Sequence, residues 1–334
     1  MRIAIDAMGG DHAPRAQVES ALAAAAEWPD TQLILVGKPE ALTPLLGGNA
    51  PSNVTIEPAT EVIESDDEPV RAVRRKSDSS MVVAGRMVKE GRADAMISAG
   101  NTGALMAVGL LVLGRLSGID RPGLAPMFPS PDNVGVLALD MGANMDAKPE
   151  HLLQYALMGT IYREKVHGIR RPRVGLLNVG TEQAKGNELT KAAYELLEQA
   201  PINFSGNIEA RDVLGGAVDV IVCDGFSGNI MLKAFEGAAS TIFSLLREEL
   251  TSSFKSKLAA ALLKPSFRRV RDRMDYNQYN GAPLLGVNGL VVKGHGSSDA
   301  VAMKTAIRHT RTAIGNGLIA ALTEEFSGKR ADQP

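Results

Sequence analysis

Short apolar runs that end in glycine-rich polar turns recur five times along this chain of 334 residues. In an open parallel sheet, the carboxyl ends of the strands line one crevice, and ligands bind there. Glycine in such a turn lets the backbone approach a ligand closely and adopt positive φ, and a helix that begins after the turn offers unpaired N–H groups to an anion. The pattern therefore predicts one anion-binding active site. The turns are residues 6–12, 98–103, 178–182, 224–229 and 293–299.

Strand-like runs alternate with helical patterns from end to end, which is typical of a mostly parallel sheet covered by helices on both faces. We therefore expect an α/β fold with a single catalytic domain, residues 1–328, and a flexible tail at 329–334. Strands are predicted at 2–6, 33–36, 54–56, 95–97, 173–178 and 219–223, and helices at 14–27, 40–46, 69–90, 103–113, 149–165, 187–199 and from 229 onward.

The composition argues against several classes of function. A formal net charge of −2 does not favour general nucleic-acid binding, which needs a basic face. The single cysteine, Cys223, rules out an internal disulfide and a cysteine-based zinc cluster. Neither metal-ligand spacing nor a P-loop nor a full dinucleotide fingerprint is present, so we expect no metal and no cofactor. With no leader sequence and no apolar stretch of membrane length, we expect a cytoplasmic protein.

Residues 240–280 depart from the α/β pattern. An apolar helical stripe, which includes Ile242, Leu246 and Leu250, precedes a run rich in Lys and Arg between residues 255 and 273. A basic amphipathic helix of this kind is typical of an interfacial membrane anchor. A solvated helical hairpin or a dimer arm has the same pattern, so both interpretations stay open at this point.

The polar turns supply the candidate binding residues, and each residue type also has an ordinary structural use. In the first turn, two carboxylates and a histidine surround a double glycine, which suits either a ligand-gripping loop or a tight turn capped by Asp11. The second turn opens an apolar helix with small residues, and this makes it the better phosphate candidate. The candidates here are Asp6, Gly9, Gly10, Asp11, His12, Ser98, Gly100, Asn101, Thr102 and Gly103.

The later turns add groups that could take part in chemistry. Lys185 lies between glycines and could neutralise phosphate or an oxyanion, although a loop lysine is often simply solvated. His295 could act as an acid or a base, and Asp299 stands beside it. The remaining candidates for phosphate or substrate binding are Asn144, Asn178, Gly180, Asp224, Gly228, Asn229, Gly296 and Ser297.

Taken together, these motifs resemble one known family. Residues 6–11, 98–104, 146–151 and 294–299, with 68–76 and 177–182, are similar to the bacterial phosphate acyltransferase of phospholipid synthesis, the PlsX family. The similarity extends from residue 1 to about residue 310. It implies a Rossmann-like α/β/α sandwich similar to isocitrate and isopropylmalate dehydrogenases and to phosphotransacetylase, with a helical hairpin extension at 240–280.

The resemblance also implies a reaction and partners. Inorganic phosphate attacks the thioester of an acyl-(acyl carrier protein) directly, without a covalent enzyme intermediate, and gives acyl phosphate for phosphatidic acid synthesis. Lys185 and the amides of residues 101–103 would then bind phosphate or the oxyanion, and His295 or Asp299 would keep phosphate dianionic. The family implies a homodimer in peripheral contact with membrane lipid through 240–280. Either the cations at 71–76 or those at 255–273 would receive the acidic carrier protein.

Three other interpretations remain. A phosphotransacetylase-like enzyme would use an acyl-coenzyme A thioester instead of the carrier protein. A metal- and nucleotide-dependent dehydrogenase could have the same architecture, although the dinucleotide fingerprint and an aspartate cluster are missing. A non-catalytic membrane scaffold could use 240–280, but the many polar turns at strand ends argue against it because such glycines have a conformational cost on folding.

Overall fold

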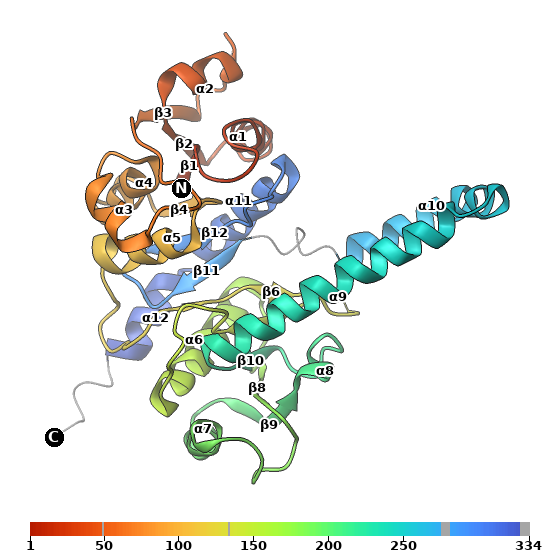
Figure 1. Cartoon of the computed structure of the whole chain (residues 1–334). Helices are drawn as coiled ribbons and strands as arrows, with labels where there is room; N and C mark the ends of the chain where they lie inside the picture. Colours follow the sequence, from red (N-terminus) through yellow and green to blue (C-terminus); the bar gives the residue numbers. More distant parts are fainter. Residues whose placement is uncertain (49, 133, 275–280, 328–334) are drawn as a thin grey trace.

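The computed structural model describes residues 1–48, 50–132, 134–274 and 281–327. In these residues the chain forms two β-sheets, of seven and five strands, one above the other in Figure 1. The chain builds most of the first sheet, crosses to the second near residue 125, and returns to the first near residue 282. We call each sheet with its helices the first and the second lobe.

The strands of the first lobe follow the order β3-β2-β1-β4-β12-β11-β5. The five strands from β3 to β12 are parallel, and the last two are antiparallel to their neighbours. The strand order reverses at β1, which is the point where open α/β sheets form their ligand crevice. The bounds are β1 (Arg2–Asp6), β2 (Gln32–Gly37), β3 (Val54–Pro58), β4 (Ala95–Ser98), β5 (Gly123–Leu124), β11 (Ala282–Leu285) and β12 (Leu290–Lys293).

Helices cover both faces of the first sheet, because successive strand residues point to opposite sides. Ile3 and Ile5 pack with the helices of one face, and Ala4 packs with those of the other. On the first face lie α1 (Arg15–Glu27), α2 (Pro39–Leu46) and α11 (Ala300–Gly315); on the second lie α3 (Pro69–Arg75), α4 (Ser80–Lys89), α5 (Thr102–Val108) and the π-helical turn η1 (Gly109–Leu113).

The second lobe repeats this layering around strands in the order β6-β7-β10-β8-β9. Leu137 and Val220 pack toward the helices of one face, while Ala138 and Ile221 pack toward those of the other. The strands are β6 (Met127–Phe128), β7 (Val136–Leu139), β8 (Arg173–Asn178), β9 (Asn203–Glu209) and β10 (Val220–Val222). The helices are α6 (Pro149–His167) and α7 (Glu188–Glu198) on one side, and α8 (Ala210–Val213) with the first turns of α9 (Gly225–Thr251) on the other.

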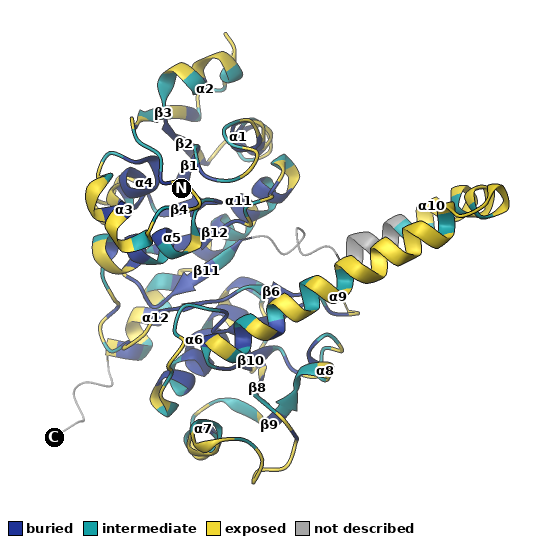
Figure 2. Ribbon diagram, in the orientation of Figure 1, coloured by how far each residue is buried: buried dark blue, intermediate teal, exposed yellow. Residues whose placement is uncertain are grey.

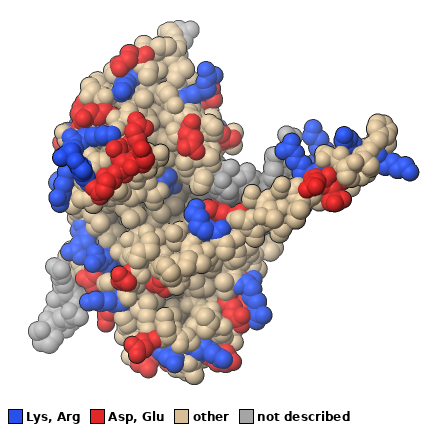
Figure 3. All heavy atoms as spheres, viewed as in Figure 1, with Lys and Arg blue, Asp and Glu red and all other residues tan. Residues whose placement is uncertain are grey.

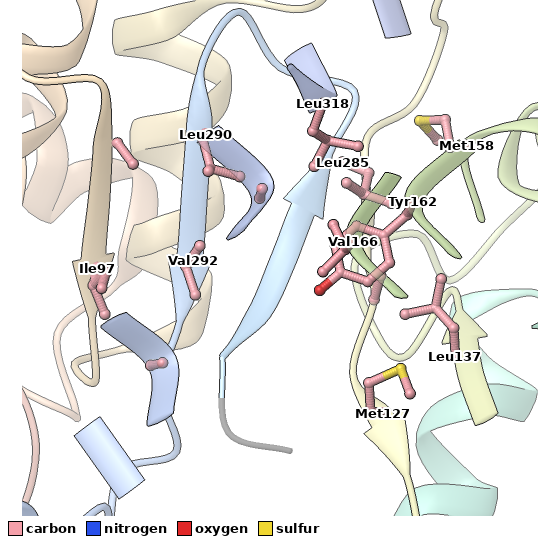
Figure 4. Packing of buried hydrophobic residues seen from close by; sticks show 14 of the residues in the cluster. Ile97, Met127, Leu137, Met158, Tyr162, Val166, Leu285, Leu290, Val292 and Leu318 are labelled. Atoms are coloured by element: carbon pink, nitrogen blue, oxygen red, sulfur yellow. The ribbon is translucent and has the colours of Figure 1, made fainter. Parts of the chain in front are cut away.

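One buried cluster extends from the first sheet to the second and holds the lobes together. Figure 4 shows Val292 of β12, Leu285 of β11, Tyr162 of α6 and Leu137 of β7 in succession across this interface. Leu318, at the start of α12 (Leu318–Ser327), packs into the same cluster. The α/β/α layering predicted from the sequence is confirmed, but it is built twice.

The expectation that all five turns follow strands of one sheet is wrong. The turns at 6–12, 98–103 and 293–299 follow strands of the first sheet, whereas those at 178–182 and 224–229 follow strands of the second. Sequence periodicity is local, so it does not say which strands pair. The helix predicted at 69–90 is divided into α3 and α4, and the one predicted at 103–113 changes from α-helical to π-helical geometry at Gly109.

The predicted helical hairpin is present in the described part of residues 240–280. α9 (Gly225–Thr251) and α10 (Phe254–Met274) run out from the second lobe together, and Figure 2 shows most of their length exposed. Large exposed apolar side chains include Ile242, Leu245 and Phe254. Residues 275–280 and the tail at 329–334 lie outside the described residues. Of the helices that the structure describes, none combines the length and apolar character needed to cross a membrane.

The first turn of α9 gives a stability prediction. A Cβ on Gly228 would lie 2.1 Å from the Asp140 carbonyl oxygen and 2.9 Å from Cys223 Sγ, so Gly228→Ala should destabilise the protein by about 3 kcal/mol. Gly237, on the same helix, has no atom within 4 Å of such a Cβ, and Gly237→Ala should stabilise by about 0.5–1 kcal/mol. Thermal melts of both variants test this; equal midpoints would show that α9 shifts freely over the Asp140 loop.

Candidate active site

The turns that follow β1, β4 and β12 meet at one edge of the first sheet. β4 pairs in parallel with both other strands, with Ile5 opposite Ile97 and Ser98 opposite Lys293. The carboxyl ends of the three strands are therefore neighbours. Three of the five predicted turns form one polar cluster, although residues 6 and 293 lie at opposite ends of the sequence.

Asp6 holds this cluster together. Its buried carboxylate accepts hydrogen bonds from Ser80 Oγ at 2.6 Å and from Ser98 Oγ at 2.6 Å. Ser98 Oγ in turn accepts the backbone N–H of Gly100 at 3.0 Å. Burial raises the pKa of Asp6, and these hydrogen bonds oppose that rise. The carboxylate therefore fixes the first two turns against each other and against α4.

The glycines of the first turn are required by close backbone approach. A Cβ on Gly9 would lie 2.5 Å from Asp6 Oδ2 and 2.8 Å from the amide nitrogen of Gly100. Gly10 has a φ of +108°, which an L side chain rarely adopts. The Asp11 amide donates to the Gly296 carbonyl at 2.8 Å, which ties the first turn to the last. The turns at 6–12, 98–103 and 293–299 thus form a single backbone-lined surface.

Lys293 is a cation of this cluster that the sequence analysis did not select. Its side chain is 8% exposed, and Nζ donates to the carbonyl oxygens of Ala99, at 3.4 Å, and Gly294. Burial lowers the pKa of Lys293 to about 8, and the negative charges of Asp6 and Asp11 limit the fall. Among the residues that the structure describes, no carboxylate is in ion-pair contact with this buried ammonium, which makes it a natural partner for an anion. The sequence signal for this cation is its position: Lys293 ends a short apolar run and is the first residue of the glycine-rich turn 293–299.

His295 and Asp299 lie in the last turn, beside this lysine. His295 Nδ1 lies 2.8 Å from Ser297 Oγ, and burial and the charge of Lys293 both lower the His295 pKa. Glu236 and Lys233 of α9 also act on that pKa, so the second lobe comes close to the cluster here. Asp299 Oδ1 accepts the Ala302 amide at 2.8 Å and caps α11.

Asn101 also has a structural task at the start of α5. Its Oδ1 accepts the Ala104 amide at 3.0 Å, and its Nδ2 donates to three carbonyl oxygens of residues 64, 65 and 67. A Cβ on Gly103 would lie 2.6 Å from Pro69, so glycine is needed where α3 and α5 meet. The side chains of His12 and Thr102 are exposed next to the cluster.

A second polar cluster lies at the carboxyl ends of β7 and β10 in the second lobe. The buried Asp140 carboxylate accepts the amides of Leu124, at 3.1 Å, and Asn144, at 2.6 Å, and burial raises its pKa. Asn144 Nδ2 donates to Tyr155 Oη at 2.7 Å. Asp224 Oδ1 accepts the Ser227 amide at 2.8 Å and caps α9. Asn229 approaches Gly142, and Gly228 approaches Asp140, so these residues hold α9 against the Asp140 loop.

Lys185 stands on the loop after β8, the next strand along the same edge of the second sheet. Its amide donates to the Glu182 carbonyl at 3.0 Å, and its carbonyl accepts Asn178 Nδ2 at 3.2 Å. The Lys185 side chain is exposed and packs close to Gly180: a Cβ added to this glycine would lie 3.1 Å from Lys185 Cγ. Asn178, Gly180 and Lys185 are therefore together, but on a different lobe from Asp6, Ser98 and Lys293.

The two lobes share cavities between them. A cavity of about 30 Å³ is lined by Met106 and Leu110 of the first lobe and by Ala143 and Asn144 of the second. A larger, open cavity of about 730 Å³ shares Leu110 and Arg121 with it. Of the polar strand ends, the Asp140 loop of the second lobe borders the smaller cavity through Ala143 and Asn144. The larger cavity has room for an extended ligand, and the turns around Lys293 form a separate site suited to an anion.

The fold places the chain in a structural class. It is similar to a phosphotransacetylase from Streptococcus pyogenes, with a TM-score of 0.61, 18% identity and coverage of 94% of both chains. It is also similar to the EutD phosphotransacetylase from Staphylococcus aureus, with a TM-score of 0.57, 15% identity and coverage of 95% of this chain and 94% of that one. The two-lobed architecture is therefore that of the phosphotransacetylases.

Sequence comparison gives the family. The model of the family described as "Fatty acid synthesis protein" matches residues 1–321. Proteins named phosphate acyltransferase from Halalkalibacterium halodurans and Brevibacillus brevis are each 60% identical to this chain, over 93% and 92% of its length and 90% and 92% of theirs. The chain belongs to this family and is an enzyme of the phosphate acyltransferase type. The resemblance predicted from the motifs is confirmed.

Proposed function

We propose that this enzyme transfers a fatty acyl group from acyl-(acyl carrier protein) to inorganic phosphate and forms the acyl phosphate used for phosphatidic acid synthesis. Membership of the phosphate acyltransferase family supports the reaction type. The observation that carries the proposal is the cluster of glycine-rich turns around the buried Lys293, a site suited to a phosphate ion. The donor and the product are the finer part of the proposal.

In this reaction a phosphate oxygen attacks the thioester carbonyl, the C–O bond forms, the C–S bond breaks, and the thiol leaves with a proton. Phosphate is the nucleophile, so no covalent enzyme intermediate forms. Positioning phosphate next to the thioester can supply several kcal/mol of the rate enhancement. We assign this positioning to the backbone of Gly9, Gly10, Gly100 and Gly296, and the countercharge to Lys293.

The catalytic roles follow from charge and position. We assign His295 as the acceptor of the proton of monobasic phosphate, because it lies in the last turn beside Lys293 and its lowered pKa leaves the imidazole neutral. Asp299 Oδ1 accepts the hydrogen bond that caps α11, and we assign the second carboxylate oxygen to orienting His295 or phosphate. Lys185, from the opposite lobe, is assigned to the oxyanion of the tetrahedral intermediate.

The test is release of thiol from palmitoyl-(acyl carrier protein) by purified, metal-free protein, with and without inorganic phosphate. Release that requires phosphate, together with formation of acyl phosphate, would support the proposal. The phosphotransacetylase-like fold favours one alternative, a coenzyme A thioester as donor. Competition between palmitoyl-coenzyme A and palmitoyl-(acyl carrier protein) separates the two donors, and absence of release from either would overturn both.

The acidic carrier protein requires a basic surface, and α3 offers one. Figure 3 shows Lys and Arg gathered over α3 at the left edge, where Arg71, Arg74 and Arg75 are exposed. Arg74→Glu/Arg75→Glu should raise the KM for the carrier-protein substrate about tenfold and leave the KM for phosphate unchanged. The matched control is Arg170→Glu/Arg171→Glu, an exposed pair on the second lobe. Equal effects of the two variants would remove α3 from consideration and leave the basic part of α10.

We assign the hairpin of α9 and α10 to a homodimer contact and to the surface of the cytoplasmic membrane. Its exposed apolar side chains, among them Leu258 and Leu262, accompany the cations Lys255 and Lys257. This combination suits an anionic lipid surface. Leu258→Asp/Leu262→Asp should abolish co-sedimentation with phosphatidylglycerol vesicles; undiminished sedimentation would exclude this contact. The net charge of −2 argues against nucleic acid as a partner.

A further inference from the structure

The cavity of about 730 Å³ lies outside the cluster assigned to inorganic phosphate. Its lining comes from both lobes: Leu110 of η1, Arg115, Asp120 and Arg121 of the segment before β5, and Lys148, Glu150 and His151 at the start of α6. We call it the mouth cavity. Its volume falls in the range of sites for extended organic ligands of roughly 300–1,000 Å³ and is far larger than one ion requires.

The cations of the mouth cavity are available to a ligand. Arg121 and Lys148 are exposed, and neither side chain has a hydrogen bond or ion pair within the part of the chain that the structure describes. Arg115 donates to the Asp120 carbonyl at 2.6 Å, which braces the loop, while Asp120 Oδ2 accepts from Gln154 Nε2 at 3.2 Å. Two cations that line one cavity repel each other, so an anionic ligand would relieve that repulsion.

His151 adds a neutral donor at the wall. It is 7% exposed, and its Nδ1 accepts the Lys148 amide at 3.1 Å, which leaves the ring proton on Nε2. Burial lowers its pKa, so the ring stays neutral at physiological pH. A buried N–H donor beside two unpaired cations is a suitable lining for phosphate oxygens.

The charge balance identifies the kind of phosphate. Three cations and two carboxylates, Asp120 and Glu150, line the cavity and leave one net positive charge. A phosphodiester carries one negative charge and balances it, whereas a phosphate dianion would exceed it. The buried Lys293 in the first lobe is the better site for the dianion.

The position of the mouth cavity points to the acyl donor. It shares Leu110 and Arg121 with the cavity of about 30 Å³, which continues inward to Met106 and Asn144. The inner cavity has a volume of about 30 Å³, which is room for one or two waters. Because this is too small for a linear arm, the arm would enter by displacing the flexible side chains of Met106 and Leu110. The thioester of an acyl carrier protein carries such an arm: a pantetheine chain with a phosphodiester at its outer end.

We propose that the mouth cavity binds the phosphodiester of the donor's pantetheine arm, with Arg121 and Lys148 as its ligands and His151 as an additional donor. The proposal rests on the proposed function for the class of donor. The charge balance favours a carrier protein, whose arm is joined through a phosphodiester, over coenzyme A, which has a diphosphate with two negative charges at this point. The proposal also gives the enzyme two separate phosphate sites, one for the nucleophile and one that positions the donor.

The first experiment measures binding without turnover. Calorimetric titration of the full-length protein compares the methyl ester of 4′-phosphopantetheine, which is a phosphodiester with one negative charge, with pantetheine. The wild type should bind the phosphorylated compound at least about tenfold more tightly, since each charge-assisted contact contributes about that factor. Arg121→Ala/Lys148→Ala should bind both alike. Lys165→Ala/Arg170→Ala, exposed near the far end of α6, is the control that keeps the preference. Equal binding by the wild type, or a preference that survives in the first variant, overturns the proposal.

The second experiment distinguishes the two sources of phosphate by kinetics. Arg121→Ala/Lys148→Ala should raise the KM for the acyl donor about 100-fold and leave the KM for inorganic phosphate and the thermal midpoint unchanged. A raised KM for inorganic phosphate instead would assign the cavity to the nucleophile and overturn the proposal. If the wild type shows the binding preference but releases no thiol, the proposed function fails while the pantetheine site stands.

Discussion

Lys293→Met is expected to abolish phosphate-dependent turnover while the protein stays folded. The ammonium is held by the carbonyls of Ala99 and Gly294 at the point where the three glycine-rich turns of the first lobe meet. Methionine has a similar length and no charge, so phosphate loses its countercharge. Loss of one such electrostatic contact lowers kcat by roughly 10²–10³-fold. Thiol release with saturating donor measures the effect, and Lys89→Met, an exposed residue that ends α4, serves as the control.

The same variant should be at least as stable as the wild type near pH 7. Lys293 has a pKa of about 8 in the folded protein, against an ordinary value of 10.5. Between these two pH values the unfolded chain binds more protons than the folded chain, so stability gains from this group as pH rises through the window. Below pH 8 the folded protein bears the full cost of the buried charge, and methionine removes it. The desolvation penalty of one buried ion is on the order of several kcal/mol, and the methionine variant does not bear it.

Thermal melts at pH 7 and pH 9.5 check this sign. The advantage of Lys293→Met over the wild type should be largest at pH 7 and smaller at pH 9.5. Wild-type turnover should also fall above pH 8, as Lys293 loses its proton. A variant that melts far below the wild type would show that Lys293 is a structural residue, and retained turnover would exclude it from phosphate binding.

The local parts of this fold could be read from the sequence, and the long-range parts could not. α6 begins at Pro149 and ends before Gly168, which is left-handed, so local residue types define its bounds. The pairing of β4 with β12 joins residues almost 200 positions apart, and no local pattern specifies it. The division of the five turns between two sheets was missed for this reason.

The candidate site has the same limit. Asn101, Asp224 and Asp299 were selected as ligands, and the structure shows each side chain capping a helix. The side chains that cap helices are also those that bind phosphate, so residue type alone does not separate the two uses. Lys293 was overlooked because a lysine at the end of a strand is usually solvated, and its burial depends on residues 99 and 294 packing around it. The roles of all these residues at the substrate remain predictions.

Lys185→Ala is expected to lower turnover sharply without unfolding the protein. Two hydrogen bonds fix the Lys185 backbone. The Lys185 amide donates to the Glu182 carbonyl, and the Lys185 carbonyl accepts from Asn178 Nδ2. The side chain is exposed, without an ion pair in the described residues, so its ammonium is positioned but not neutralised. If it stabilises the oxyanion, its loss should reduce kcat by about 10²-fold or more, with a smaller change in the KM for either substrate.

Lys191→Ala provides the matched control, because Lys191 is exposed on α7 a short distance along the chain. Both alanine variants remove one solvated lysine from the second lobe, so general loss of surface charge affects them equally. A fall in kcat confined to Lys185→Ala would place the cation of the transition state on the second lobe and that of phosphate, Lys293, on the first. Catalysis would then require both lobes to close on the substrates. Unchanged kcat in Lys185→Ala would leave the chemistry to the first lobe alone.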